Sequence, residues 1–428
     1  SVYLTEPLNG DAAIAALGAR LPEVAALNGR GTAELTSLLR RDVTLWVSPS
    51  GLLFFRDPPL PQAVEPPAHA PFPYAVTFQL HSRSGSSRVI FLDFDGFTMP
   101  GSTKWANMGG TQVGGYSTEG DASFSAAEQD VIQAVWQRIA EDYAPFDVDV
   151  TTEDPGNAAI DRSGPADTVF GTRLVFSSDA TAWLRACDSD CGGVAFVGTF
   201  AHTAEHPNYQ PAFVFSNGAP GVKNLAEAGS HEAGHNLGLL HDGLVAVPGR
   251  DAVKYYTGCI PPATACPGAW APIMGVGYFK PVTQWSKGEY QDADNPQDDL
   301  AVIQANGLSL RADDHGDSTG TATPLGSAGT FSSSGVITTA ADTDYFAFTA
   351  GAGTITATVS PAANGPNRDI SLQLRNSAGA VLTTVDPTVA MSNADVATGM
   401  DATLAFVLPA GGTYYLAVDT LGGATPGD

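Results

Sequence analysis

The sequence HEAGHNLGLLHD, from His231 to Asp242, decides how the central part of this chain folds. It holds three of the chain's eight histidines. Because His231 and His235 are four residues apart, both imidazoles project from one face of a helix and can chelate one ion. Gly238 can adopt a positive φ and turn the chain back, which brings His241 to the same ion. The segment therefore predicts a helix that ends at a metal site.

Neutral imidazoles suit zinc, and three protein ligands leave a fourth coordination position for water. We therefore predict Zn²⁺ bound by His231, His235 and His241. Glu232 lies beside the metal-facing side of the helix, where its carboxylate can reach a metal-bound water. We predict that Glu232 accepts the proton of this water and later passes it to the leaving group. For Asp242 we predict that it orients a ligand or makes a structural hydrogen bond.

The charge of the chain excludes several classes of partner. The net charge is -25, from 45 acidic and 20 basic residues, and this excess repels nucleic acid and anionic membranes. No apolar run approaches the roughly 18 residues that span a bilayer. We expect a monomer without nucleic-acid partners or a membrane span. Some carboxylates could bind Ca²⁺, including those in ADTDYF and DDHGDS, although ordinary turn residues are the favoured interpretation there.

The four cysteines form two close pairs, Cys187 with Cys191 and Cys259 with Cys266. Two local disulfides are the simplest connectivity, and they indicate an oxidising, extracellular compartment. A zinc knuckle built from all four is the alternative, but neither spacing is C-x-x-C. The sequence begins at Ser1 without a charged and then apolar leader, so we expect any signal peptide to lie outside this numbering.

Three regions follow one another along the chain. Helical patterns, a hairpin in VTLWVSPSGLLFF and a proline-rich linker predict a small α+β region over residues 1–80. Strand and helix patterns alternate over 81–308, which predicts an α/β domain with a twisted, mostly parallel sheet and a helix carrying the histidines. Residues 309–428 are rich in Gly, Ser and Thr with short alternating runs such as DYFAFTA, which predicts an all-β sandwich.

The histidine segment resembles the long motif of the metzincin zinc endopeptidases, H-E-x-x-H-x-x-G-x-x-H. Asp242 after the third histidine is similar to the adamalysin, or reprolysin, branch. APIMGVGY places Met274 where that family has its Met-turn, and the resemblance extends over about residues 87–307. It implies that GGVAFVG is an edge strand that pairs with extended substrates. Tyr278 follows Met274 by four residues, whereas astacin-like and serralysin-like enzymes have a zinc-binding tyrosine two residues after theirs. We interpret Tyr278 as a packed aromatic, with a transition-state donor as the alternative.

The C-terminal phrases DDHGDSTGTATPL, DTDYFAFTA and GTYYLAVDT resemble the bacterial pre-peptidase C-terminal domain. This resemblance implies a secreted bacterial enzyme whose tail aids secretion, folding or substrate attachment. Residues 1–80 then look like a pro-region. Some metzincins keep themselves inactive with a pro-region cysteine, but all cysteines here lie at or beyond position 187. Asp57 in FFRDPP could instead bind zinc in a zymogen, as in astacin-like precursors, although a charged turn beside the hairpin is the favoured interpretation.

Other polar groups offer alternatives to this site. His202 and His206 are four apart and could bind a second metal, but a solvated loop is favoured. Asp93 with Asp95, and Asp147 with Asp149, could form paired-carboxylate catalysts, but structural or calcium-binding roles are favoured.

The sequence therefore predicts a secreted zinc metalloendopeptidase that acts on protein or peptide substrates. The main alternative is a secreted adhesion or matrix-binding protein whose protease-like domain no longer cuts. The intact Glu232 argues against that alternative. A zinc hydrolase acting on a non-peptide amide is the third possibility, since it would keep the metal and change only the substrate.

Overall fold

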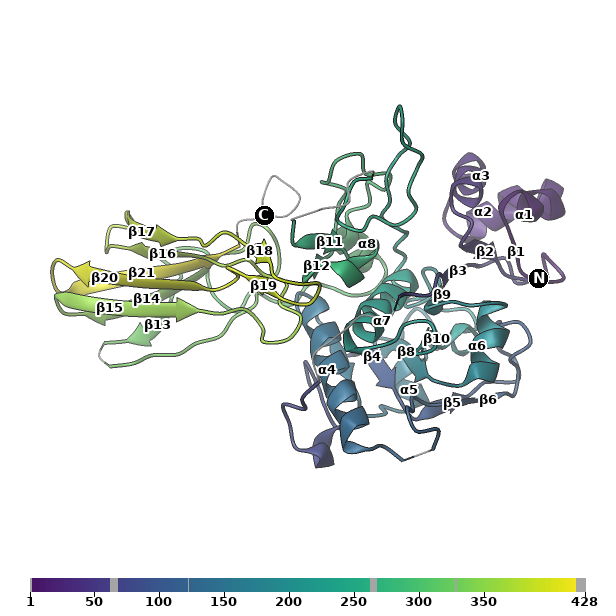
Figure 1. The fold of residues 1–428 in the computed structure, drawn as a ribbon, viewed down its shortest axis with the longest axis horizontal. Coiled ribbons are helices and arrows are strands. Elements are labelled where there is room, and N and C mark those ends of the chain that lie inside the picture. Colours follow the sequence, from purple (N-terminus) through teal and green to yellow (C-terminus); the bar gives the residue numbers. More distant parts are fainter. Residues whose placement is uncertain (1, 62–67, 122, 262–267, 328, 421–428) are drawn as a thin grey trace.

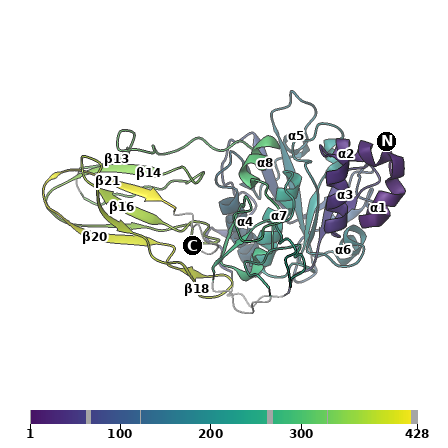
Figure 2. The same cartoon turned by 90° about the horizontal axis from the view of Figure 1, so that it is seen from above.

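The computed structural model describes residues 2–61, 68–121, 123–261, 268–327 and 329–420. Three parts lie along an elongated molecule, with the N-terminal helices at one end, the α/β region in the middle and the C-terminal strands at the other end (Figure 2). Within the described ranges, no helix has the length and apolar character needed to cross a membrane. The N-terminal helices are α1 (Gly10–Leu17), α2 (Leu21–Leu27) and α3 (Thr32–Arg41).

The central sheet has eight strands in the order β1-β2-β3-β9-β10-β8-β4-β7. β10, β8, β4 and β7 pair in parallel, whereas β9 runs antiparallel to β10. The predicted α/β region with a mostly parallel sheet is confirmed, and its one reversed strand is the predicted edge segment. The strands of this part are β4 (Arg88–Asp93), β7 (Asp149–Thr151), β8 (Phe170–Ser177), β9 (Gly193–Phe196) and β10 (Ala212–Phe215).

Two helices pack against each other beside this sheet, α4 (Ala126–Asp142) and α7 (Val222–Asn236) (Figure 1). α4 begins with a capping box between Ser125 and Glu128, which satisfies its first backbone donors. The ring of Trp136 is buried and its indole N–H donates to the carbonyl of Val150. The α4 helix therefore contributes both apolar contacts and a hydrogen bond to the central core.

A last helix of the central region is α8 (Asp299–Ala305). The carboxylate of Asp298 accepts a hydrogen bond from the backbone of Ala301 and so caps the first turn. The smaller elements around the sheet are β5 (Gly96–Thr98), β6 (Gln112–Gly114), α5 (Asn157–Ile160), α6 (Ala180–Cys187), β11 (Trp270–Pro272) and β12 (Val282–Gln284).

The N-terminal hairpin extends the central sheet. Its strands are β1 (Leu8–Asn9), β2 (Leu45–Val47) and β3 (Leu53–Asp57), with the turn between β2 and β3 where the sequence predicted it. β3 pairs antiparallel with β9, and Asp57 lies opposite Gly193. Residues 1–57 keep a hydrophobic core of their own, which Leu240 of the central region joins. The sequence predicted the hairpin but not its attachment to the edge strand.

The C-terminal region is a β-sandwich, as predicted. A five-stranded sheet in the order β13-β14-β21-β16-β17 packs against the pair β15-β20 around a common core. The strands are β13 (Thr323–Gly326), β14 (Asp344–Ala350), β15 (Gly353–Val359), β16 (Ser371–Arg375), β17 (Val381–Val385), β20 (Ala402–Leu408) and β21 (Gly412–Asp419), with a small ladder of β18 (Ala390–Met391) and β19 (Ala397–Thr398).

One of the two expected disulfides is present in the structure. Cys187 and Cys191 are bonded, with 5.5 Å between their Cα atoms. The bond joins the end of α6 to the segment that leads into β9. The second expected pair includes Cys266, which lies outside the described residues.

Candidate metal centre

The end of helix α7 brings the third histidine to the other two. Gly238 has φ of 94°, a conformation that glycine adopts without strain. Its N–H donates to the carbonyl of His235, and the N–H of Leu239 donates to that of Gly234. A side chain at position 238 would also meet the amide of Asn306 at 2.7 Å. The chain therefore reverses at Gly238, as the sequence predicted.

The three imidazoles are buried and held by the same kind of contact. Nδ1 of His231 donates to the carbonyl of Ile273, and Nδ1 of His235 donates to that of Leu239, each at 2.8 Å. Nδ1 of His241 donates to the carboxylate of Asp42, also at 2.8 Å. Because carbonyl oxygens only accept, the proton of His231 and of His235 lies on Nδ1 and the lone pair lies on Nε2.

The free Nε2 atoms meet at one point, where Asp57 adds a carboxylate. Oδ1 of Asp57 lies 2.8 Å from Nε2 of His241. Oδ2 lies 3.6 Å from Nε2 of His231 and 3.5 Å from that of His235. One ligand atom from each of these four buried residues falls within 4.8 Å of the others. The interpretation of Asp57 as a charged turn residue is therefore wrong. Asp57 is the last residue of β3, and its carboxylate lies among the histidine nitrogens.

The donor set fits a zinc ion. Among the described residues, Nε2 of His231 and Oδ2 of Asp57 have no hydrogen-bond partner although both atoms are buried. Buried polar atoms without partners are rare in folded proteins and indicate an ion or water between them. Three imidazole nitrogens and one carboxylate oxygen are ligands that zinc accepts in a tetrahedral arrangement.

Burial and neighbouring charges set the ionisation of these groups. Burial opposes ionisation of Asp57, but the charge of His241 and the hydrogen bonds from His235 and His241 outweigh it and hold its pKa well below the usual range. Burial lowers the pKa of His231 to about 3, so this imidazole is neutral. Burial also disfavours charge on His241, yet Asp57 and Asp42 raise its pKa to about 9. The two carboxylates therefore supply negative charge that a cation would balance.

The N-terminal region adds two more residues around the histidines. Asp42, which follows α3, holds His241 as described above. The ring of Phe55 lies 4.3 Å from that of His235 and 4.1 Å from that of His241, measured between ring centroids. Beside them, the hydroxyl of Tyr255 from the central region donates to Oδ1 of Asp57 at 2.6 Å. Sequence reasoning missed Asp42, Phe55 and Tyr255, because no local pattern relates them to histidines so distant in the chain.

Glu232 lies beside the four ligand atoms and against the edge strand. It is buried, and its Oε2 has no hydrogen-bond partner in the described part of the chain. Burial and the charge of Asp57 raise the pKa of Glu232 well above its usual value. A Cβ atom on Gly193 would lie 2.1 Å from Oε1 of Glu232. The strand β9 can therefore pass the carboxylate only because position 193 is glycine.

The segment after the histidines packs against the helix that carries them. Met274 is fully buried, and its sulfur would lie 2.7 Å from a Cβ on Gly234, so the turn packs directly against helix α7. The N–H of Asp242 donates to the carbonyl of Met274. Burial and the charge of Asp294 raise the pKa of the Asp242 carboxyl to about 7. Asp242 thus joins the histidine segment to the turn through its backbone.

Tyr278 lies close to the site but is only half-buried. Burial raises the pKa of Tyr278 well above its usual value, and the charges of Glu227, Asp57 and Glu232 add to this effect. These charges place the ring within electrostatic range of the metal centre. The role of Tyr278, a packed aromatic or a transition-state donor, therefore stays a prediction.

The other polar groups singled out from the sequence have structural partners. His206 is buried beside the carbonyl of Phe200, and its Nδ1 accepts from the backbone of Arg162. The carboxylate of Asp93 forms a buried ion pair with Arg173. Further along, Asp147 pairs with Arg83, and Asp149 pairs with His81. These contacts favour structural roles for His206, Asp93, Asp147 and Asp149.

Comparison with known protein families agrees with this geometry. Residues 140–284 match the model of metallo-peptidase family M12B, reprolysin-like, and residues 342–420 match that of the bacterial pre-peptidase C-terminal domain. No curated protein and no solved structure matches the chain. The central region is therefore similar to the reprolysin-like M12B metallopeptidases, and the C-terminal region is similar to the bacterial pre-peptidase C-terminal domain.

The contact between Gly193 and Glu232 gives a test of the site. We expect Gly193→Ala to displace the glutamate carboxylate, because the new methyl group and Oε1 would overlap. Peptidase activity should fall about 100-fold or more while zinc content stays unchanged. Gly101→Ala, in open space, is the matched control. Wild-type activity in Gly193→Ala would contradict this placement of Glu232.

Proposed function

We propose that this chain is the precursor of a secreted zinc endopeptidase that hydrolyses peptide bonds in protein substrates. The observation that carries the proposal is the convergence of three buried imidazole nitrogens beside the carboxylate of Glu232. His231, His235 and His241 would hold the ion. The pre-peptidase C-terminal domain is typical of secreted bacterial peptidases, and it supports an extracellular location.

The residues of the site divide the chemistry between them. A bound zinc ion would polarise the scissile carbonyl and lower the pKa of its water. Glu232 would accept the proton of the attacking water and pass it to the leaving amine. The hydroxyl of Tyr255, which donates to Asp57 in this structure, would donate to the substrate carbonyl oxygen as that oxygen gains negative charge.

We further propose that residues 1–57 keep the peptidase latent. β3 covers the edge strand β9, which extended substrates would otherwise pair with. Asp57 places its carboxylate where a water or substrate oxygen would bind, and Phe55 covers two of the histidine rings. The chain then leaves the site through Pro58, Pro59 and Pro61, which are exposed.

Activation would therefore need a cut in the linker and the release of β3. We keep the boundaries expected from the sequence, with the pro-region and linker over 1–80, the catalytic domain over 81–308 and the sandwich over 309–428. Because β3 is part of the central sheet, release of the pro-region must also break the ladder that it forms with β9.

The mechanism predicts that Glu232→Ala lacks peptidase activity but still binds zinc. We expect kcat to fall by a factor of about 1000, the middle of the range for a lost general base, when cleavage of a denatured protein is measured after removal of residues 1–80. Zinc content, measured by elemental analysis, should stay at one ion per chain. Cleavage that survives either this substitution or a chelator would refute the mechanism.

If Asp57 keeps the uncut chain latent, Asp57→Asn should raise peptidase activity instead of lowering it. The amide keeps the shape of the side chain but loses the charge that faces the histidines, so we expect the uncut chain to become at least about tenfold more active. Asp188→Asn is the matched control, because that exposed carboxylate pairs with Arg56 on the same strand. Equal activity of wild-type and Asp57→Asn chains before cleavage would count against latency through this residue.

The proposed role of Tyr255 predicts a selective loss after activation. In the chain without residues 1–80, Tyr255→Phe should lower kcat about 10- to 100-fold with little change in KM, because the donor acts mainly on the transition state. Tyr256→Phe is a suitable control, since its ring stacks on Tyr290 in a neighbouring cluster. A KM effect with unchanged kcat would assign Tyr255 to substrate binding instead.

A further inference from the structure

The chain stays against the central region after Asp57. The N–H of Gly192 donates to the carbonyl of Asp57 at 2.8 Å, and the N–H of Leu60 donates to the carbonyl of Gly218 at 2.6 Å. Gly218 belongs to the turn between β10 and α7. Residues 58–61, the start of the linker, therefore run from the histidines toward the beginning of α7.

The side chain of Asn224 holds the end of this segment. Its Nδ2 donates to the carbonyl of Pro61 at 3.0 Å. Asn224 lies seven residues before His231, so both side chains project from the same face of α7, about 10 Å apart along the helix axis. Four residues of extended chain span up to about 14 Å, which covers that distance. The linker therefore follows the face of α7 that carries the histidines.

One atom of the Asn224 amide has no partner. Asn224 is 1% exposed, and its Oδ1 accepts no hydrogen bond within the ranges that the structure describes. Because Oδ1 and Nδ2 belong to one planar amide, the oxygen lies beside the main chain that the nitrogen binds. Pro61 has no N–H to donate to it. In an extended strand the N–H and C=O of one residue point to the same side, so another residue at this position would offer both groups to Asn224.

Leu60 adds a side-chain contact next to this amide. It is half-buried, whereas Pro58, Pro59 and Pro61 are exposed. Its side chain packs against the hydrophobic core of the central region, and its Cδ1 would lie 3.9 Å from a Cβ on Gly192. We call this contact the Leu60 subsite. Its surroundings are apolar, so they favour an apolar side chain.

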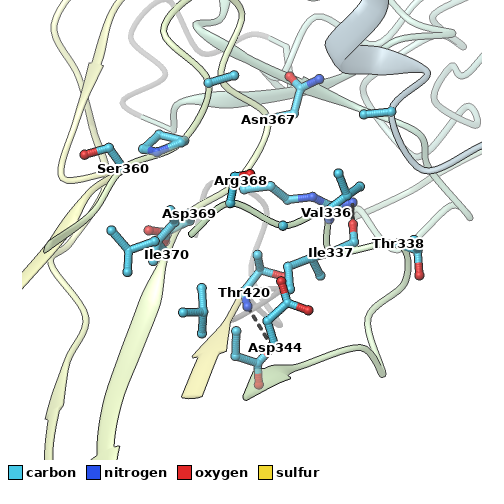
Figure 3. Close-up of a pocket in the computed structure, with 18 of the residues that line it drawn as sticks. Val336, Ile337, Thr338, Asp344, Ser360, Asn367, Arg368, Asp369, Ile370 and Thr420 are labelled. Atoms are coloured by element: carbon cyan, nitrogen blue, oxygen red, sulfur yellow. Dashed lines mark hydrogen bonds between the residues drawn. The ribbon is translucent and has the colours of Figure 1, made fainter. Parts of the chain in front are cut away.

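The linker-binding region is separate from a large hollow in the C-terminal part of the molecule. That hollow has a volume of about 1560 Å³, and Ile337, Asp344 and Arg368 are among the residues that line it (Figure 3). Neither Asn224 nor residues 58–61 take part in its lining. The contacts of Asn224 and of the Leu60 subsite are therefore made by the linker itself, at a place of their own beside α7.

The direction of the linker indicates what this region would bind. β3 pairs antiparallel with β9, and residues 58–61 continue in the same direction. An extended substrate that pairs with β9 in the same sense would reach Asn224 with residues on the carboxyl side of the cleaved bond. We propose that Asn224 binds the substrate main chain there, and that the Leu60 subsite takes the apolar side chain of the preceding residue. This assignment rests on the proposed endopeptidase function.

The test measures peptide binding by the full chain after it has folded and its linker has been cut, with residues 1–61 separated. Glu232→Ala keeps the peptides intact, and equal zinc content shows that each variant is folded. The probes are the amidated peptide LFFRDPPLP, the sequence of residues 53–61, and the same peptide with Pro61→Ala. We expect Pro61→Ala to raise the affinity about fivefold more on this parent than on its Asn224→Ala variant, because only the parent can accept the added N–H. Equal ratios would overturn the role of Asn224.

The Leu60 subsite is tested with two further peptides. Leu60→Asp should weaken binding at least about tenfold, because the carboxylate would lose water against an apolar surface. Pro59→Ala is the matched control, since that side chain is exposed. If the Leu60→Asp peptide bound as tightly as the unchanged peptide, the apolar subsite would be wrong.

Kinetics with Glu232 intact connect the region to substrates. In the cut chain, Asn224→Ala should raise KM for a denatured protein about fivefold and leave kcat within about twofold, because the contact is equally present before and during cleavage. Asn217→Ala, exposed in the same turn as Gly218, should behave like the parent. An unchanged KM would overturn the substrate role. Peptide binding that depends on Asn224, without cleavage by the parent, would refute the endopeptidase function and support the binding region.

Discussion

The carboxylate of Asp57 lies where three histidine nitrogens converge, and the elements of the central region pack closely around this point. Four ligand atoms within 4.8 Å of one another require that every surrounding element approach closely. Glycines meet that demand at three places: Gly193 lets the edge strand pass Glu232, Gly234 lets the Met274 turn reach α7, and Gly238 reverses the chain. These glycines thus let the backbone pack closely around the carboxylate and the histidines of the metal centre.

The same contact would let an N-terminal region inhibit a peptidase without a cysteine. The hairpin strand β3 pairs with β9, and this ladder aims Asp57 at the histidines. The backbone pairing of β3 with β9 fixes the position of Asp57 along the strand. The negative charge of its carboxylate then stabilises the imidazoles, which are otherwise costly to bury. Asp42 extends this complementarity to His241 from the outer side. The N-terminal region would therefore keep the peptidase latent by occupying the surface that binds substrate.

The sandwich is connected to the helix that carries the histidines. Asn367 donates to one oxygen of Asp142 at the end of α4, and Ser230 donates to the other. Ser230 directly precedes His231 on α7. Burial, together with the charge of Glu227, raises the pKa of Asp142 well above its usual value. A short hydrogen-bonded path thus runs from the C-terminal domain to the metal centre, in addition to the covalent link through Ser309 and Leu310.

The sequence by itself determined the features that depend on local spacing. Periodicity predicted the strands and helices of the central region, and the offsets of His231, His235, Gly238 and His241 predicted the helix and its reversal, because they follow from helical geometry and glycine conformation. Only the tertiary structure decided what fills the remaining space around the histidines. Asp57, Asp42 and Tyr255 reach the site through a strand pairing and loop packing between segments distant in the chain. No local pattern encodes such contacts, since they arise from burying one surface against another.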